Sequence, residues 1–126
     1  MLNILMIALG AALGGVLRHF ATLGITRIMG TDFPYGTIAV NVAGSFLMGV
    51  LIVWLSTHEP HSQALRLFAS VGVLGAFTTF STLSLDAYVL LERGAYGSAF
   101  IYIFGSFIVG LLALWVGLTV SRSVWL

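Results

Sequence analysis

The sequence predicts an all-α membrane protein with four transmembrane helices and a break in the third helix. Of its 126 residues, 60% are hydrophobic and 7% are charged, whereas about 25% of the residues of a soluble domain are charged. The apolar residues form four segments, each near or above the roughly 20 residues that a helix needs to cross a bilayer. We therefore interpret residues 1–126 as a single four-span transmembrane domain.

The four segments follow one another with short polar connections. The expected spans are approximately Leu2–Leu23, Tyr35–Leu55, Gln63–Glu92 and Tyr96–Val120. Because the connections are short, consecutive helices must run antiparallel. The first segment carries Gly10, Gly14 and Gly15, which predict a face that another helix can approach closely.

Small and polar residues also recur at helical spacing in the second and fourth segments. The second segment has Asn41, Gly44, Ser45 and Gly49, and the fourth has Tyr102, Ser106 and Gly110. Residues three or four positions apart share a helical face. An amide in mid-span must satisfy two donor hydrogens and an acceptor, so Asn41 is expected either to join two helices or to bind a ligand.

The third segment contains GVLGAFTTFSTLS, residues 72–84, whose second half has five hydroxyl side chains. Glycines beside β-branched residues form helix poorly. We expect the backbone to unwind between Gly75 and Thr78 and to present carbonyl groups to an ion. The alternative is a plain helix whose hydroxyls bond back to the carbonyl one turn earlier.

The charged residues are few and nearly balanced. The chain has five basic residues, all arginine, and no cysteine, so disulfides and thiolate chemistry are excluded and no basic run predicts nucleic-acid binding. On the predicted topology one side of the membrane has Arg66 and Arg122, and the other has Arg27 and Arg93, with Arg18 near it. Orientation follows the asymmetry of basic residues in short loops. This balance predicts insertion both ways and pairing of opposite copies as an antiparallel dimer.

The remaining polar residues give weaker indications. Arg18 lies inside the first span and is expected either to extend to the interface or to attract anions. Asp86 is expected near the interface, paired with an arginine or hydrated. His58 and His61 are a weak metal signal, and a hydrated turn is favoured. No nucleophile, base and orienting group come together, so we expect no enzyme.

The residues GTIAVNVAG (36–44) and GVLGAFTTFSTLS (72–84) resemble the paired motifs of the Fluc, or CrcB, family of bacterial fluoride channels, and the resemblance extends over nearly the whole chain. It implies a dual-topology homodimer in the inner membrane, with two antiparallel fluoride pores and a structural sodium ion. The implied sodium ligands are the carbonyls of Gly75 and Thr78. The implied anion pathway comprises Arg18, Thr37, Asn41, Phe80, Ser81, Thr82, Leu83, Tyr102 and Ser106.

The sequence departs from the family motif at two positions. Leu83 replaces the second phenylalanine of the family's aromatic pair, and Ala76 replaces a glycine. Leucine has no positive ring edge to offer an anion. Two alternatives are a subunit that does not conduct by itself and a proton-coupled small-multidrug exporter. The exporter requires a carboxylate in the first span, and no acidic residue precedes Asp32.

Overall fold

The computed structural model describes all of residues 1–126, and it is entirely helical. The elements are α1 (Leu2–Met29), α2 (Tyr35–His58), α3 (Gln63–Arg66), the π-helical segment η1 (Leu67–Leu74), α4 (Gly75–Phe77), α5 (Phe80–Glu92) and α6 (Tyr96–Trp125). Segments α3 to α5 together form the third span. The four helical stretches are long and apolar enough to cross a membrane, which confirms the predicted fold class.

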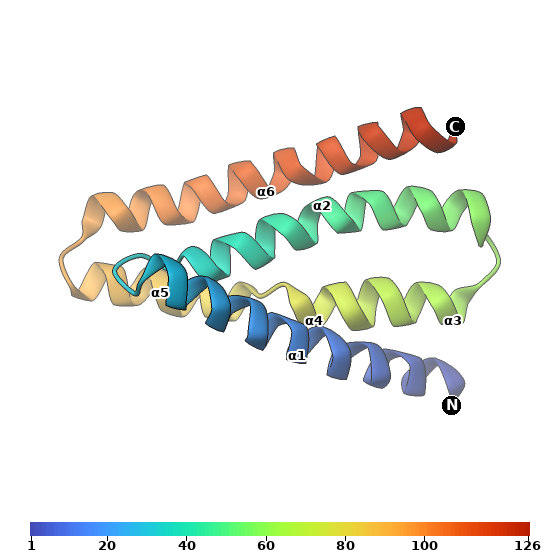
Figure 1. Cartoon of the computed structure of the whole chain (residues 1–126), viewed down its shortest axis with the longest axis horizontal. Helices are drawn as coiled ribbons and strands as arrows, with labels where there is room; N and C mark the ends of the chain where they lie inside the picture. The colour runs from blue at the N-terminus through green and yellow to red at the C-terminus, as the bar shows by residue number, and fades with distance from the viewer.

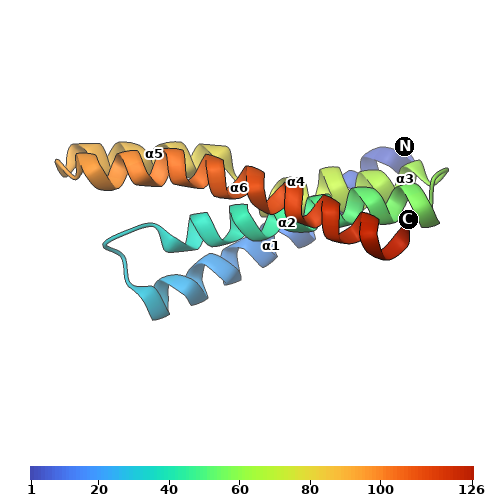
Figure 2. The ribbon, with the colours of Figure 1, turned by 90° about the horizontal axis from the view of Figure 1, so that it is seen from above.

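Consecutive spans run antiparallel, as predicted. Figure 1 shows both chain termini and the α2–α3 connection at one end of the molecule, and the α1–α2 and α5–α6 connections at the other. In Figure 2 the α1–α2 connection diverges from the α5–α6 pair at its end of the bundle. The α1–α2 and α5–α6 connections therefore lie apart from each other at the end opposite the termini (Figure 2).

Two helices extend well beyond the predicted spans. Helix α1 continues to Met29 and α6 to Trp125. In both cases the helix extends past the end of the apolar segment into more polar sequence. Helix α1 stops at Gly30, whose positive φ of 86° is a backbone conformation that glycine adopts far more easily than other residues.

The glycine face of α1 lets its backbone touch that of η1. A Cβ atom at Gly10 would overlap the Phe68 carbonyl oxygen, and a Cβ atom at Gly14 would overlap the Val73 carbonyl oxygen. Gly15 has no atom within 4 Å of that position. The predicted close approach is confirmed for Gly10 and Gly14 and is wrong for Gly15, which lies on another side of the helix.

The replacement Gly14→Ala is therefore expected to destabilise the fold by about 1–3 kcal/mol, the usual cost of overpacking. The clash is with backbone atoms, which cannot rotate away. Gly15→Ala is the matched control, and it is expected to be neutral or slightly stabilising because alanine favours helix. Thermal unfolding in detergent measures both; equal melting temperatures would contradict the observed packing.

The small face of α2 serves two different neighbours. A Cβ atom at Gly44 would overlap the methyl group of Thr78, and one at Gly49 would meet the backbone of α6 at Leu114. Gly117 of α6 makes the reciprocal approach to the Phe46 carbonyl of α2. Helix α2 is thus held directly against both α6 and the interrupted third span.

A single chain buries little of itself. Only 18 of its 126 residues are buried, so most large apolar side chains face outward. Near the middle of the third span, the side chain of Phe80 is 82% exposed. The outer surface is therefore suited to lipid or to another chain rather than to water.

Candidate functional site

The third span is interrupted at Thr78 and Thr79. Thr78 has φ −88° and ψ 158°, and Thr79 has φ −153° and ψ 123°, so both are extended. Gly75 and Ala76 remain helical within α4. The predicted interruption is confirmed, but its predicted location is wrong for Gly75, because the chain unwinds after α4 and not at the glycine.

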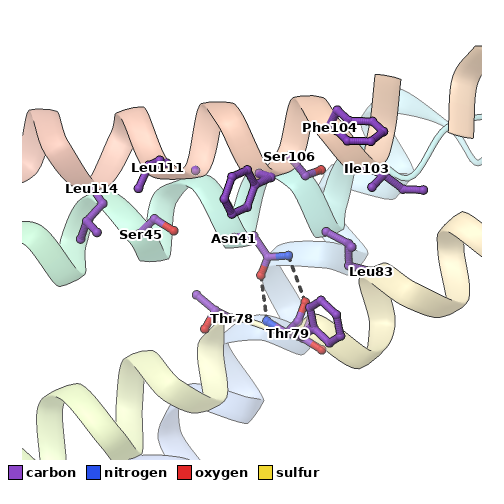
Figure 3. A pocket seen from close by; sticks show the side chains of 13 residues that line it. Asn41, Ser45, Thr78, Thr79, Leu83, Ile103, Phe104, Ser106, Leu111 and Leu114 are labelled. Atoms are coloured by element: carbon purple, nitrogen blue, oxygen red, sulfur yellow. Dashed lines mark hydrogen bonds between the residues drawn. The ribbon is translucent and has the colours of Figure 1, made fainter. Parts of the chain in front are cut away.

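The side-chain amide of Asn41 braces this break from α2. Its Oδ1 accepts a hydrogen bond of 2.8 Å from the Thr79 N–H, and its Nδ2 donates one of 3.0 Å to the Thr79 carbonyl. Figure 3 shows both bonds across the gap between the two helices. Asn41 therefore pairs with both backbone groups of Thr79, its N–H and its carbonyl, as the backbone of a neighbouring β-strand would.

These bonds release two backbone carbonyls. In a continuous helix the N–H of Thr79 would donate to the Gly75 carbonyl, and the N–H of Thr82 to the Thr78 carbonyl. Here Thr79 donates to Asn41 and Thr82 donates to the Thr79 hydroxyl, at 3.3 Å. The carbonyls of Gly75 and Thr78 thus lose their helical donors, and free carbonyl oxygens of this kind suit a hard cation.

The hydroxyl groups around the break have two different roles. Thr78 and Ser84 bond back to the carbonyl one turn earlier, as the plain-helix alternative predicts for single hydroxyls. Thr79 instead caps α5 and lies 3.1 Å from the Thr82 hydroxyl and 3.5 Å from that of Ser81. The last three form a hydroxyl cluster at the start of α5.

A pocket of about 580 Å³ opens between α2, α6 and the break. Its polar lining comes from Asn41, Ser45, Thr78, Thr79 and Ser106. Its apolar lining includes Phe80, Leu83, Ile103, Phe104, Phe107, Leu111 and Leu114. The pocket is therefore mainly apolar, with a few uncharged hydrogen-bonding groups and no charged side chain.

Ser106 supplies an unusual polar atom in this pocket. Its side chain is buried, and its Oγ has no hydrogen-bond partner. Leaving a buried hydroxyl unpaired costs about 1–3 kcal/mol. Ser106 and Asn41 both line this cavity, although the Ser106 Oγ is itself buried.

A second polar cluster surrounds Asp86 of α5. Its Oδ2 accepts hydrogen bonds from the Thr37 hydroxyl at 2.8 Å and from the Tyr102 hydroxyl at 2.9 Å. Thr37 lies in the first turn of α2, whose helix dipole favours a negative charge. Of the two expectations for Asp86, the arginine partner is not found, because two hydroxyls bind its Oδ2 instead, while its partly exposed position beside the smaller cavity is compatible with hydration.

The replacement Tyr102→Phe is expected to destabilise the fold by about 1.5–3 kcal/mol, the usual worth of a hydrogen bond to a charged group. Tyr102 is fully buried, with 0% of its surface exposed. Tyr88→Phe is the matched control, because Tyr88 donates to Glu92 over a similar 2.8 Å but on the surface. Equal losses of thermal stability in the two variants would contradict a buried role for the first bond.

The other candidate polar residues do not form a site. His58 stacks on Trp54, with ring centroids 5.3 Å apart, and its Nδ1 lies 2.8 Å from the Thr57 hydroxyl. No group of three metal-ligating side chains occurs in the chain. The weak metal signal of His58 and His61 is therefore not supported.

Comparison with known proteins identifies the relatives of this arrangement. The family model described as "CrcB-like protein, Camphor Resistance (CrcB)" matches residues 5–118. The chain belongs to the CrcB family. Relatives named fluoride-specific ion channel FluC include those of Methylobacterium nodulans, 47% identical over 98% of each chain, and of Chelativorans, 46% identical over 98% of this chain and 99% of the relative. The relative from Caulobacter vibrioides is 44% identical over 97% of both chains.

The structure of this CrcB protein separates the expected pathway residues into groups. Four of them line the pocket: Asn41, Phe80, Leu83 and Ser106. Thr37 and Tyr102 hold Asp86. Ser81 and Thr82 belong to the hydroxyl cluster at the start of α5, and Arg18 lines neither the pocket nor the smaller cavity beside Asp86.

Three residues of the site were not predicted as functional. Thr79 caps α5, and threonine is one of the residues preferred at the N-cap of a helix. Ser45 was assigned only to a small face of α2, although it lines the pocket. The role of Asp86 carries no local sequence signal, because its partners come from two other helices.

Proposed function

We propose that the protein is a passive fluoride channel of the bacterial inner membrane. The observation that carries this proposal is the pocket beside the break, which Asn41 and Ser106 line and which contains no charged side chain. The names of the relatives support fluoride as the ion. Uncharged donors can replace the water that a small anion loses without trapping it.

The pocket suggests how an anion would be accommodated. The Nδ2 of Asn41 has two N–H groups, of which one donates to Thr79, so the other is available to the pocket. The Ser106 hydroxyl can rotate to donate, and the positive ring edge of Phe80 can face an anion. Leu83 contributes only apolar surface at the same pocket.

We propose that the functional unit is an antiparallel homodimer, in which the two copies cross the membrane in opposite orientations. The near balance of arginines and the exposure of Phe80 and Gly75 beside the break support it. The lack of cysteine allows a single reporter, L126C, to be labelled with a membrane-impermeant maleimide in intact cells. About half of the copies should react if the topology is dual; labelling of all copies or of none would refute the dimer.

A structural sodium ion at the dimer centre is part of the proposal. Each copy would supply the carbonyls of Gly75 and Thr78, whose helical donors are engaged elsewhere. Such carbonyls are costly to leave free in a membrane, and a bound cation would compensate them. Replacing all sodium by a large organic cation should weaken the dimer, and unchanged dimer stability would refute the site.

Two other functions lead to different measurements. A proton-coupled exporter would use Asp86, the carboxylate held by two hydroxyls inside the third span, and its transport would require a proton gradient. A subunit that conducts only with a different partner would be inactive when purified alone. Efflux from liposomes loaded with fluoride or with chloride tests the proposal: fluoride should leave and chloride should stay, whereas equal efflux of both ions would refute it.

A further inference from the structure

Asn41 uses both polar atoms of its side chain on one residue of the break. Its Oδ1 accepts from the Thr79 N–H at 2.8 Å, and its Nδ2 donates to the Thr79 carbonyl at 3.0 Å. The two residues are 38 positions apart and belong to different spans.

The pairing competes directly with helix formation. If Thr79 returned to a helical conformation, its N–H would bond to the Gly75 carbonyl. In the observed conformation that N–H is taken by Asn41, and Gly44 leaves room for the Thr78 side chain beside it. The amide on α2 therefore determines whether the Gly75 carbonyl is free.

We propose that Asn41 is a positioning residue that holds the third span open and links the break to the anion pocket. Its Oδ1 and one Nδ2 hydrogen keep Thr79 extended, and its other Nδ2 hydrogen reaches the pocket. An anion in the pocket and a cation at the released carbonyls would then be coupled through one side chain. The inference about ions rests on the proposed function, whereas the inference about the break does not.

The test compares three variants with the native protein. Asn41→Ala removes both bonds, and the isosteric Asn41→Asp keeps an acceptor for the Thr79 N–H but has no donor for its carbonyl. Ser45→Ala is the matched control, because Ser45 lines the same pocket one turn further along α2 and makes no hydrogen bond to the break. The first readout is the Cα and Cβ chemical shifts of Thr79 in threonine-labelled protein, which distinguish extended from helical backbone.

The native protein and Ser45→Ala should show extended shifts at Thr79. Asn41→Ala should lose them, and Asn41→Asp should give intermediate values. Unchanged Thr79 shifts in Asn41→Ala, or the same loss in Ser45→Ala, would overturn the positioning role. Because this readout needs no transport, it stands even if the protein does not conduct fluoride.

The second readout addresses the coupling of the ions. Loss of the two hydrogen bonds that maintain the break should raise the sodium concentration for half-maximal fluoride efflux at least about tenfold in Asn41→Ala. A residue that only donated to the anion would instead reduce fluoride efflux and leave the sodium requirement unchanged, which would overturn the coupling. Native protein without any sodium requirement would refute the sodium site but not the role of Asn41 at the break.

Discussion

The replacement Gly75→Val is expected to abolish the dimer and fluoride efflux while leaving a folded monomer in the membrane. Gly75 is exposed in the single chain, and a Cβ atom there would meet only the carbonyl of Ser70, at 3.5 Å. The chain itself therefore tolerates a larger residue at this position. In the proposed dimer the same face lies at the sodium site, where a branched side chain would separate the two copies.

Chemical cross-linking in membranes and efflux from liposomes measure the two effects of Gly75→Val. Gly105→Val is the control, because a Cβ atom at Gly105 of α6 would have no atom within 4 Å. This variant should retain the dimer. Thr78→Ser should be mild, since its proposed contribution is a backbone carbonyl. A Gly75→Val protein that remains dimeric and active would refute the placement of this face at the dimer centre.

The replacement Phe80→Leu is expected to slow fluoride efflux strongly. Phe80 lines the pocket, and with Leu83 already in place of a second aromatic ring it is the aromatic residue that the break presents to an anion. A loss of about 1.4 kcal/mol of stabilisation at the barrier would slow passage about tenfold. Initial rates of efflux, compared at equal protein density, measure the change.

Phe100→Leu is the matched control for Phe80→Leu, because Phe100 is an exposed ring of α6 outside the pocket. The reverse change Leu83→Phe should raise the rate, since it adds a ring edge to the same cavity. Equal rates for the native protein and Phe80→Leu would mean that the ring does not contact the ion.

The four spans could be predicted from the sequence because the length of an apolar segment is a local property. The helix ends were less predictable, since helix α1 continues beyond Leu23 until Gly30, whose φ is positive. Glycine spacing also predicted a close helix contact at Gly10 and Gly14, which the structure shows to be with η1. It could not exclude Gly15, because the direction in which α1 is rotated depends on its neighbours.

The break was predicted in the correct span and included Thr78, but its start at Gly75 was wrong and Thr79 was missed. Low helix propensity pointed to Gly75, whereas the extended residues are Thr78 and Thr79. The cause is tertiary: Asn41 offers an acceptor and a donor at the level of Thr79. A side chain on another helix cannot be placed from the local sequence, and the same limit applies to Asp86 and its two hydroxyl partners.

The most direct test of the central claim is fluoride efflux from liposomes loaded with potassium fluoride, measured with and without valinomycin and with and without a pH gradient. An uncoupled channel moves charge, so efflux should depend on the potassium pathway that valinomycin provides and should not require a pH gradient. Efflux that proceeds without valinomycin and is driven by a proton gradient would contradict a passive fluoride channel.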